Sequence, residues 1–148
     1  MVFKEDIIQR ERGVAKLIYN LGEAWEQMEK ANKERDEEPS KRWRAHFDYL
    51  RARLAAQIAY IYEYQSMLGQ LRKELPARDP NLHNGWRLAS QEKLQGDKAG
   101  KDMAKEAKKI WDKIIEKYPG TPWELLAKRD RLTTLGLEWQ AVRIGGER

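Results

Sequence analysis

Apolar residues recur at helical spacing over two long stretches of this chain, with a proline between them. The first stretch runs from Lys4 to about Asp36 and the second from Lys41 to Leu75. Residues three, four and seven apart lie on one face of a helix, so each stretch predicts one long amphipathic helix. The apolar positions are Ile7, Val14, Ile18, Leu21, Trp25, Met28 and Ala31 in the first stretch, and Trp43, Phe47, Leu50, Leu54, Ile58, Ile61, Leu68, Leu71 and Leu75 in the second.

The break between the two predicted helices is short. Pro39 takes Glu38 out of the helical region of backbone conformation, and Ser40 can cap a second helix that Pro76 then ends. Two long helices joined by so few residues become antiparallel neighbours. Acidic side chains close the first helix and basic ones open the second, so we expect the two sets to lie side by side and offset one another. The two sets are Glu34, Asp36, Glu37 and Glu38, and Lys41, Arg42, Arg44, Arg51 and Arg53.

The second helix changes character along its length. Over residues 54–71 Glu63 is the single charged side chain, and three tyrosines point to several faces: Tyr60, Tyr62 and Tyr64. A helix that is apolar most of the way round must be covered on more than one side. We therefore expect the tip of the hairpin, residues 26–53, to protrude as a stalk. Its base, residues 1–25 and 54–75, should be packed by the C-terminal half of the chain.

The C-terminal half begins with a segment rich in helix breakers. Residues 76–100 contain two prolines and three glycines and predict a connecting segment. Within it, Trp86 to Ala89 could form a short helical turn. Apolar residues return to helical spacing from Lys101 to about Lys117, which predicts a third helix.

The stretch "YPGTPWELLA" ends that helix and begins another. A proline and a glycine stop the first helix. Thr121 can then cap the next one, Pro122 suits its first position, and Glu124 completes a capping box. The fourth helix ends at Gly136 or runs on to Trp139, and it must turn back on the third.

Composition agrees with an all-α fold. The chain has 148 residues, of which 36% are charged and 41% hydrophobic, and valine occurs only three times. We therefore expect one helical domain over residues 1–148. It consists of a long antiparallel helical hairpin (1–75), a connecting segment (76–100), and a shorter helix pair (101–141) that packs against the base of the hairpin.

The sequence offers no convincing catalytic or metal-binding set. The absence of cysteine excludes a disulfide scaffold, a thiolate zinc site and a cysteine nucleophile. The two histidines, His46 and His83, lack further ligands at suitable spacing, and carboxylate pairs such as Glu23 and Glu26 lack an apolar pocket that would separate their pKa values. We predict no catalytic residues, no metal and no cofactor.

Alanines and large apolar residues at helical spacing, followed by "YPGTPWELLA", resemble the junction between tetratricopeptide-like repeat units. The residues that carry the resemblance are Ala104 or Ala107, Trp111, Tyr118, Pro119, Trp123 and Ala127. Only one such pair is present, without a repeat of about 34 residues, whereas about three units normally bury one another's faces. The resemblance therefore implies a single tetratricopeptide-like helix pair over residues 101–139.

A second resemblance covers most of the chain from Trp43 onward. The segments "RARLAAQIAYIYEYQSMLGQLRKEL", "NGWRLAS" and "PGTPWELLAKRDRLTTLGLEW" are similar to the C-terminal helical region of large bacterial proteins that carry a von Willebrand factor type A domain upstream. The adhesion motif of such a domain, Asp-x-Ser-x-Ser, is absent from this sequence. The resemblance implies no functional residues. It implies an excised module whose Met1 is an added start.

Six tryptophans are many for a chain of this length. Core packing at helix crossings accounts for them, and the alternative is a groove for a partner. Trp86 and Trp139 are the best candidates for such a groove because they lie in or near the less regular segments. With His83 and Arg87 they form our predicted partner-binding set.

We expect a non-catalytic protein-interaction or scaffolding module of a larger bacterial protein. The alternatives are nucleic-acid binding through basic helix faces and homodimerisation through the hairpin. The net charge of +5 is spread along the chain, which makes nucleic acid the weaker candidate partner. The N-terminus lacks an apolar run of signal-peptide length, and we expect no membrane span and a slight preference for the cytoplasm.

Overall fold

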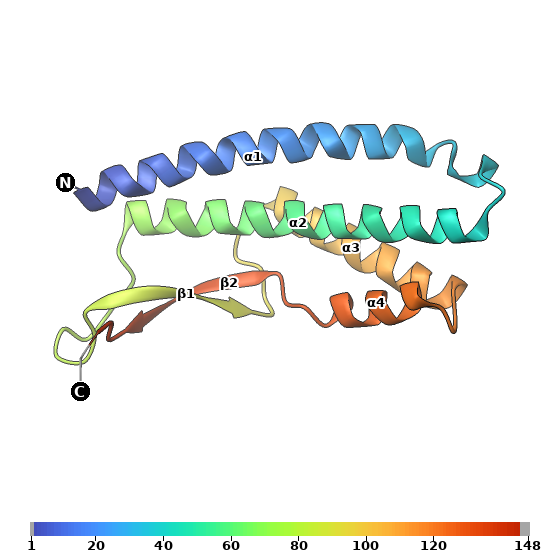
Figure 1. Ribbon diagram of the computed structural model, residues 1–148. Coiled ribbons are helices and arrows are strands. Elements are labelled where there is room, and N and C mark those ends of the chain that lie inside the picture. The colour runs from blue at the N-terminus through green and yellow to red at the C-terminus, as the bar shows by residue number, and fades with distance from the viewer. Residues whose placement is uncertain (1, 146–148) are drawn as a thin grey trace.

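The computed structural model describes residues 2–145 and is predominantly helical (Figure 1). Its α-helices are α1 (Val2–Asn32), α2 (Lys41–Lys73), α3 (Lys98–Lys117) and α4 (Pro122–Arg131). A short 3₁₀ helix, η1 (Arg35–Glu37), lies between α1 and α2, and two strands, β1 (Gly85–Gln91) and β2 (Gly136–Val142), form a small sheet. In Figure 1, α2 lies between α1 on one side and the sheet and α4 on the other, and α3 crosses behind α2.

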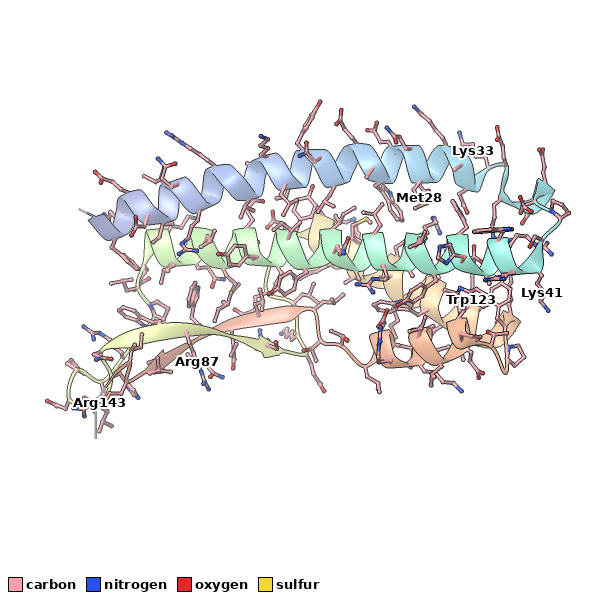
Figure 2. The ribbon with its side chains drawn as sticks, in the orientation of Figure 1. Met28, Lys33, Lys41, Arg87, Trp123 and Arg143 are labelled. Carbon is pink, nitrogen blue, oxygen red and sulfur yellow. The ribbon has the colours of Figure 1, made fainter. Side chains whose placement is uncertain are left out.

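The two long helices lie side by side and run in opposite directions (Figure 1). Ser40 caps α2 as predicted, since its hydroxyl accepts a hydrogen bond from the backbone N–H of Trp43 at 3.3 Å. Val14 of α1 and Ile61 and Leu68 of α2 form a buried cluster between the helices. Figure 2 shows Met28 on the side of α1 that faces α2. The helical period of the sequence therefore located both helices to within a few residues.

Alanines form the face of α2 that packs against α3. The larger core cluster joins these alanines to apolar residues of α3 and α4: Ala45, Tyr49, Ala52, Ala55, Ala107, Ile110, Trp111, Ile114, Tyr118 and Ala127. Small side chains let two helix backbones approach closely. A Cβ added to Gly100 of α3 would lie only 3.0 Å from the Cβ of Tyr62. The predicted inward stripe was therefore wrong at Trp43 and Leu50, which are 61% and 43% exposed.

The seam between α3 and α4 is the predicted capping box. The Thr121 hydroxyl accepts from the N–H of Glu124 at 3.4 Å, and the Glu124 carboxylate accepts from the N–H of Gly120 at 2.7 Å. Gly120 has a φ of +74°, which a residue with a side chain rarely adopts. This turn sends α4 back along α3, as the sequence predicted.

The all-α prediction was wrong in the C-terminal half. β1 occupies the segment predicted as a connection with a helical turn, and β2 replaces the predicted continuation of the fourth helix toward Trp139. The strands are antiparallel, with Leu88 opposite Trp139. Side chains alternate between the two faces of a strand. Trp86, Leu88, Leu137 and Trp139 therefore share the face that covers α2, whereas Arg87 and Gln140 share the outer face.

The C-terminal half does cover the base of the hairpin, but through the sheet, and the predicted place of the helix pair was wrong. The α3–α4 pair packs against the N-terminal half of α2, so the tip of the hairpin does not protrude alone. The sheet covers the other half, where Met67 is fully buried. Tyr62 and Tyr64 are half-buried as expected, but Tyr60 remains 45% exposed. The helix pair packs near the tip because the alanine face lies in the first half of α2, where its small side chains let α3 approach.

The ion pairs at the tip also differ from the prediction. Among residues 2–145, none joins the acidic set at the end of the first predicted helix to Lys41, Arg42 or Arg44. Arg51 instead links all three long helices. Its guanidinium lies 5.1 Å above the ring centre of Trp25 and pairs with Glu29 of α1 at 2.7 Å and Glu106 of α3 at 3.2 Å.

Candidate functional site

The predicted partner-binding tryptophans lie on the helix-facing side of the sheet. Both indole N–H groups donate to backbone carbonyls at 2.9 Å, that of Trp86 to Pro76 and that of Trp139 to Met67. The guanidinium of Arg78 also lies 5.0 Å above the centre of the Trp86 ring. Each ring is half-buried. These contacts anchor the sheet to α2 and to the segment that follows it.

The other two predicted residues lie elsewhere. Arg87 is exposed on the outer face of the sheet, where its guanidinium donates to the side-chain oxygen of Gln140 (Figure 2). His83 belongs to the turn before β1, and its Nδ1 accepts from the N–H of Asp79 at 3.4 Å. The structure therefore brings Trp86 and Trp139 to one face but places Arg87 on the opposite one.

A buried carboxylate joins α2 to the connection between β1 and α3 and to the start of β2. Glu63 is 1% exposed, and its oxygens accept backbone hydrogen bonds from Gln95 at 2.6 Å and Gly96 at 2.8 Å, with Leu137 at 3.5 Å. Buried charged groups require such partners. Glu63 is noticeable in the sequence as the single charged residue of an apolar stretch. The sequence does not show which hydrogen-bond donors surround it.

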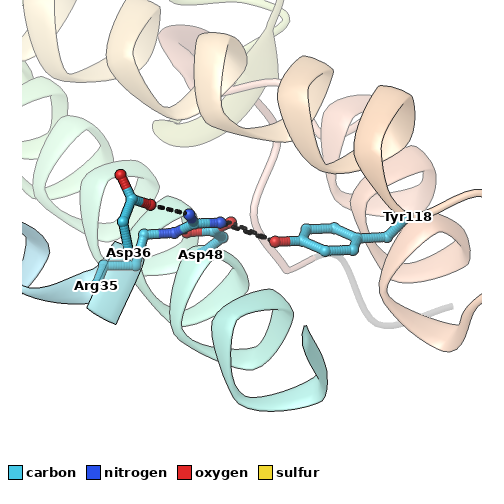
Figure 3. Close-up of polar contacts among 4 residues, drawn as sticks. All are labelled: Arg35, Asp36, Asp48 and Tyr118. Carbon is cyan, nitrogen blue, oxygen red and sulfur yellow. Dashed lines mark hydrogen bonds and ion pairs between the residues drawn. The ribbon is translucent and has the colours of Figure 1, made fainter. Parts of the chain in front are cut away.

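A second polar cluster joins η1, the first turns of α2 and the C-terminal end of α3 (Figure 3). Arg35, in η1, donates from Nε to Asp48 at 2.6 Å and from Nη2 to the Tyr118 hydroxyl at 2.8 Å. That hydroxyl in turn donates to Asp48 at 3.0 Å. The hydrogen bond to Asp48 raises the pKa of Arg35. Burial, and then the charge of Asp48, raises the pKa of Tyr118.

An apolar groove opens between the two long helices and the connection from α4 to β2. We call it the hairpin groove. It has a volume of about 690 Å³, within the range of about 300–1,000 Å³ that is usual for ligand sites. Its apolar lining consists of Leu17, Leu21, Ala56, Tyr60, Ile61 and Leu135. Leu17 and Tyr60 are 44% and 45% exposed, so the groove presents apolar surface to solvent.

Charged side chains gather at one end of the hairpin groove. The hydroxyl of Tyr49 donates to Asp130 at 2.7 Å, and Arg129 donates to the same carboxylate at 2.8 Å. Burial raises the pKa of Tyr49, the hydrogen bond to Asp130 adds to this rise, and the neighbouring Arg53 opposes it. Arg53 also lines the groove. The rim thus carries two guanidinium groups and one carboxylate.

Trp111 forms part of the wall of the hairpin groove and is 4% exposed. Its indole N–H is buried and finds no acceptor within the described part of the chain. A buried donor without a partner costs about 1–3 kcal/mol.

Leu17, Tyr60 and Arg53 were not predicted as site residues. The signal that could have found the first two is a large apolar side chain lying off the inward stripe of its helix. Arg53 resembled the other basic residues at the start of α2. Arg53 lies one turn from Tyr49 on α2, but the other charges of the rim, Arg129 and Asp130, come from α4, more than sixty residues later in the chain.

Over residues 2–145, no group of three or more His, Asp or Glu side chains is arranged to hold a metal ion. Within the same residues, each helix is too short or too polar to cross a bilayer. No family model, curated protein or solved structure matches this chain.

Proposed function

We propose that this chain is a non-catalytic protein-interaction module and that the hairpin groove is its docking surface. The observation that carries the proposal is the apolar lining of the groove, where Leu17 and Tyr60 stay nearly half exposed beside buried neighbours. Exposed apolar surface with a polar rim is typical of protein-binding sites. A partner would gain free energy by covering these two side chains.

The walls of the hairpin groove come from separate elements that are held together by specific contacts. Arg51 links α1 to α2 and α3 through Glu29 and Glu106. Tyr49 links α2 to α4 through Asp130. A surface fixed in this way loses little conformational entropy when a partner binds.

The two resemblances support the same class of function. We propose that α3 and α4 act as a single tetratricopeptide-like pair that completes the groove, and that the module belongs to a larger bacterial protein. The predicted set of His83, Trp86, Arg87 and Trp139 remains a prediction. Its best-exposed member, Arg87, would form a second contact site on the outer face of the sheet.

Selection from a displayed random-peptide library tests the proposal. The matched pair of variants is Leu17→Asn with Tyr60→Ser in the hairpin groove, and Tyr19→Ser on the exposed side of α1, where Tyr19 is 66% exposed. Peptides enriched on the wild type should bind the groove variant at least about tenfold more weakly, because interface centres dominate affinity. They should bind the Tyr19 variant as before. Failure to enrich any peptide, or equal binding to both variants, would contradict the proposal.

The outer face of α3 favours a second candidate function, the binding of nucleic acid. Its exposed lysines include Lys101, Lys105, Lys108, Lys109 and Lys113. In the part of the chain that the structure describes, none of these five forms an ion pair. Lysines along one helix face can follow a phosphate backbone.

A gel shift with double-stranded DNA distinguishes this candidate from the first. Binding through α3 should weaken steeply between about 50 and 200 mM salt. It should also weaken when Lys105, Lys108 and Lys109 are changed to glutamine. No shift at low salt would remove nucleic acid as a partner and leave the protein-interaction proposal unaffected.

A further inference from the structure

The helical walls of the hairpin groove have the geometry of a site for a third helix. Leu17 and Leu21 lie one turn apart on α1, and Gln57 and Ile61 lie one turn apart on α2. Residues four apart form the ridges by which helices pack into one another's grooves. A partner helix with apolar residues at i, i+3, i+4 and i+7 would place its own ridge between these two.

The charge at the rim decides which helix fits. Arg129 and Tyr49 already donate hydrogen bonds to the carboxylate of Asp130. Within residues 2–145, Arg53 has no carboxylate partner. A docked helix would remove water from this guanidinium, and that loss is unfavourable unless the partner supplies a carboxylate. A carboxylate can accept two parallel hydrogen bonds from one guanidinium.

We propose that the hairpin groove receives an acidic amphipathic helix of a partner protein, with a carboxylate of that helix on Arg53. This inference rests on the proposed function and adds to it the chemistry of the partner. The apolar stripe of the partner covers Leu17 and Tyr60. The carboxylate lies at the end of the groove beside Tyr49.

Fluorescence anisotropy with defined peptides tests the inference. The probes are three fluorescein-labelled helical peptides with the same leucines at i, i+3, i+4 and i+7, flanked by glutamate, glutamine or lysine. The proteins are the full chain, Arg53→Glu, and the control Lys33→Glu, which makes the same charge change at an exposed lysine just after α1. Circular dichroism confirms that each variant is folded.

The glutamate peptide should bind the wild type about tenfold more tightly than the glutamine peptide, as expected for one charge-assisted pair. Arg53→Glu should reverse this order and favour the lysine peptide, whereas Lys33→Glu should preserve the wild-type order.

Equal binding of the three peptides, or a wild-type preference for lysine, would overturn the acidic partner. The docking surface would still stand in that case, because the library selection tests it separately. If no peptide binds, the inference also fails, and the library selection alone then decides whether the groove is a docking surface. A preference for glutamate that Arg53→Glu leaves unchanged would also overturn the assignment to Arg53.

Discussion

At the scale of single residues, Glu63 is a buried carboxylate that is held by backbone hydrogen-bond donors. It accepts backbone hydrogen bonds from Gln95, Gly96 and Leu137 while 1% exposed. Glu63→Gln would turn an NH₂ group toward these donors and leave at least one of them without an acceptor. We expect the free energy of unfolding to fall by about 2 kcal/mol, measured by urea denaturation. Exposed Glu92→Gln is the control, and an equal effect of the two changes would contradict this role.

A second prediction at this scale concerns pH and Tyr118. Its pKa in the folded protein lies above the ordinary value of 10.0, because burial and then Asp48 disfavour the phenolate. The neutral phenol therefore stabilises the fold below about pH 10, and this contribution is lost as pH rises through the folded pKa.

The variant Tyr118→Phe tests this pH dependence. At pH 7 it should be less stable than the wild type by about 1 kcal/mol, because it loses its hydrogen bonds to Arg35 and Asp48. The difference should shrink above pH 10, since the phenylalanine variant has no phenol to ionise. The free energy of unfolding of both proteins is measured by urea denaturation at each pH. A difference in this free energy that stays constant from neutral to strongly alkaline pH would contradict the assignment.

At the scale of elements, the helices were predictable and the strands were not. Helical period and capping residues located α1, α2, α3 and the start of α4 to within a few residues, because both signals are local. β1 and β2 have seven residues each, and their alternation is too short to separate from an irregular segment. Each strand is stabilised by the other, and residues 92–135 of the chain lie between them. A local pattern cannot reveal such a pairing.

The start of β2 offers a prediction at this scale. A Cβ on Gly136 would lie 2.6 Å from the carbonyl oxygen of Gln91, with the Lys93 carbonyl beside it. The backbone must therefore shift in Gly136→Ala, and we expect a loss of about 2 kcal/mol, measured as the change in thermal unfolding. Gly69→Ala is the matched control in α2, where nothing lies within 4 Å. Alanine there should stabilise the helix by up to about 1 kcal/mol.

At the scale of the whole molecule, the long hairpin was predictable and the position of its cover was not. Long apolar stripes indicated two neighbouring helices, but the sequence did not show that alanines, and not Trp43 or Leu50, would face α3. The hairpin groove shares this origin, because its walls come from elements distant in sequence. Its residues could be identified only once these elements were placed together.

Homodimerisation, the other alternative, concerns the molecule as a whole. We expect the chain to sediment as a monomer of 17.5 kDa, because a positively charged rim on both copies would oppose pairing groove to groove. Sedimentation equilibrium over a range of protein concentrations measures this. A dimer that Leu17→Asn with Tyr60→Ser dissociates would instead show that a second copy fills the groove.

The position of α1 at the outside of the fold has a consequence for dynamics. α2 covers the inward face of α1, whereas α2 itself is packed from several directions. Swinging α1 outward would break fewer interactions than unfolding the rest, so its amides should exchange with deuterium sooner than those of α2. Leu17 and Leu21 belong to α1, so an outward movement of this helix removes one wall of the hairpin groove. A partner bound across both long helices would therefore hold α1 in place, and slower deuterium exchange of the α1 amides would indicate that the partner has bound.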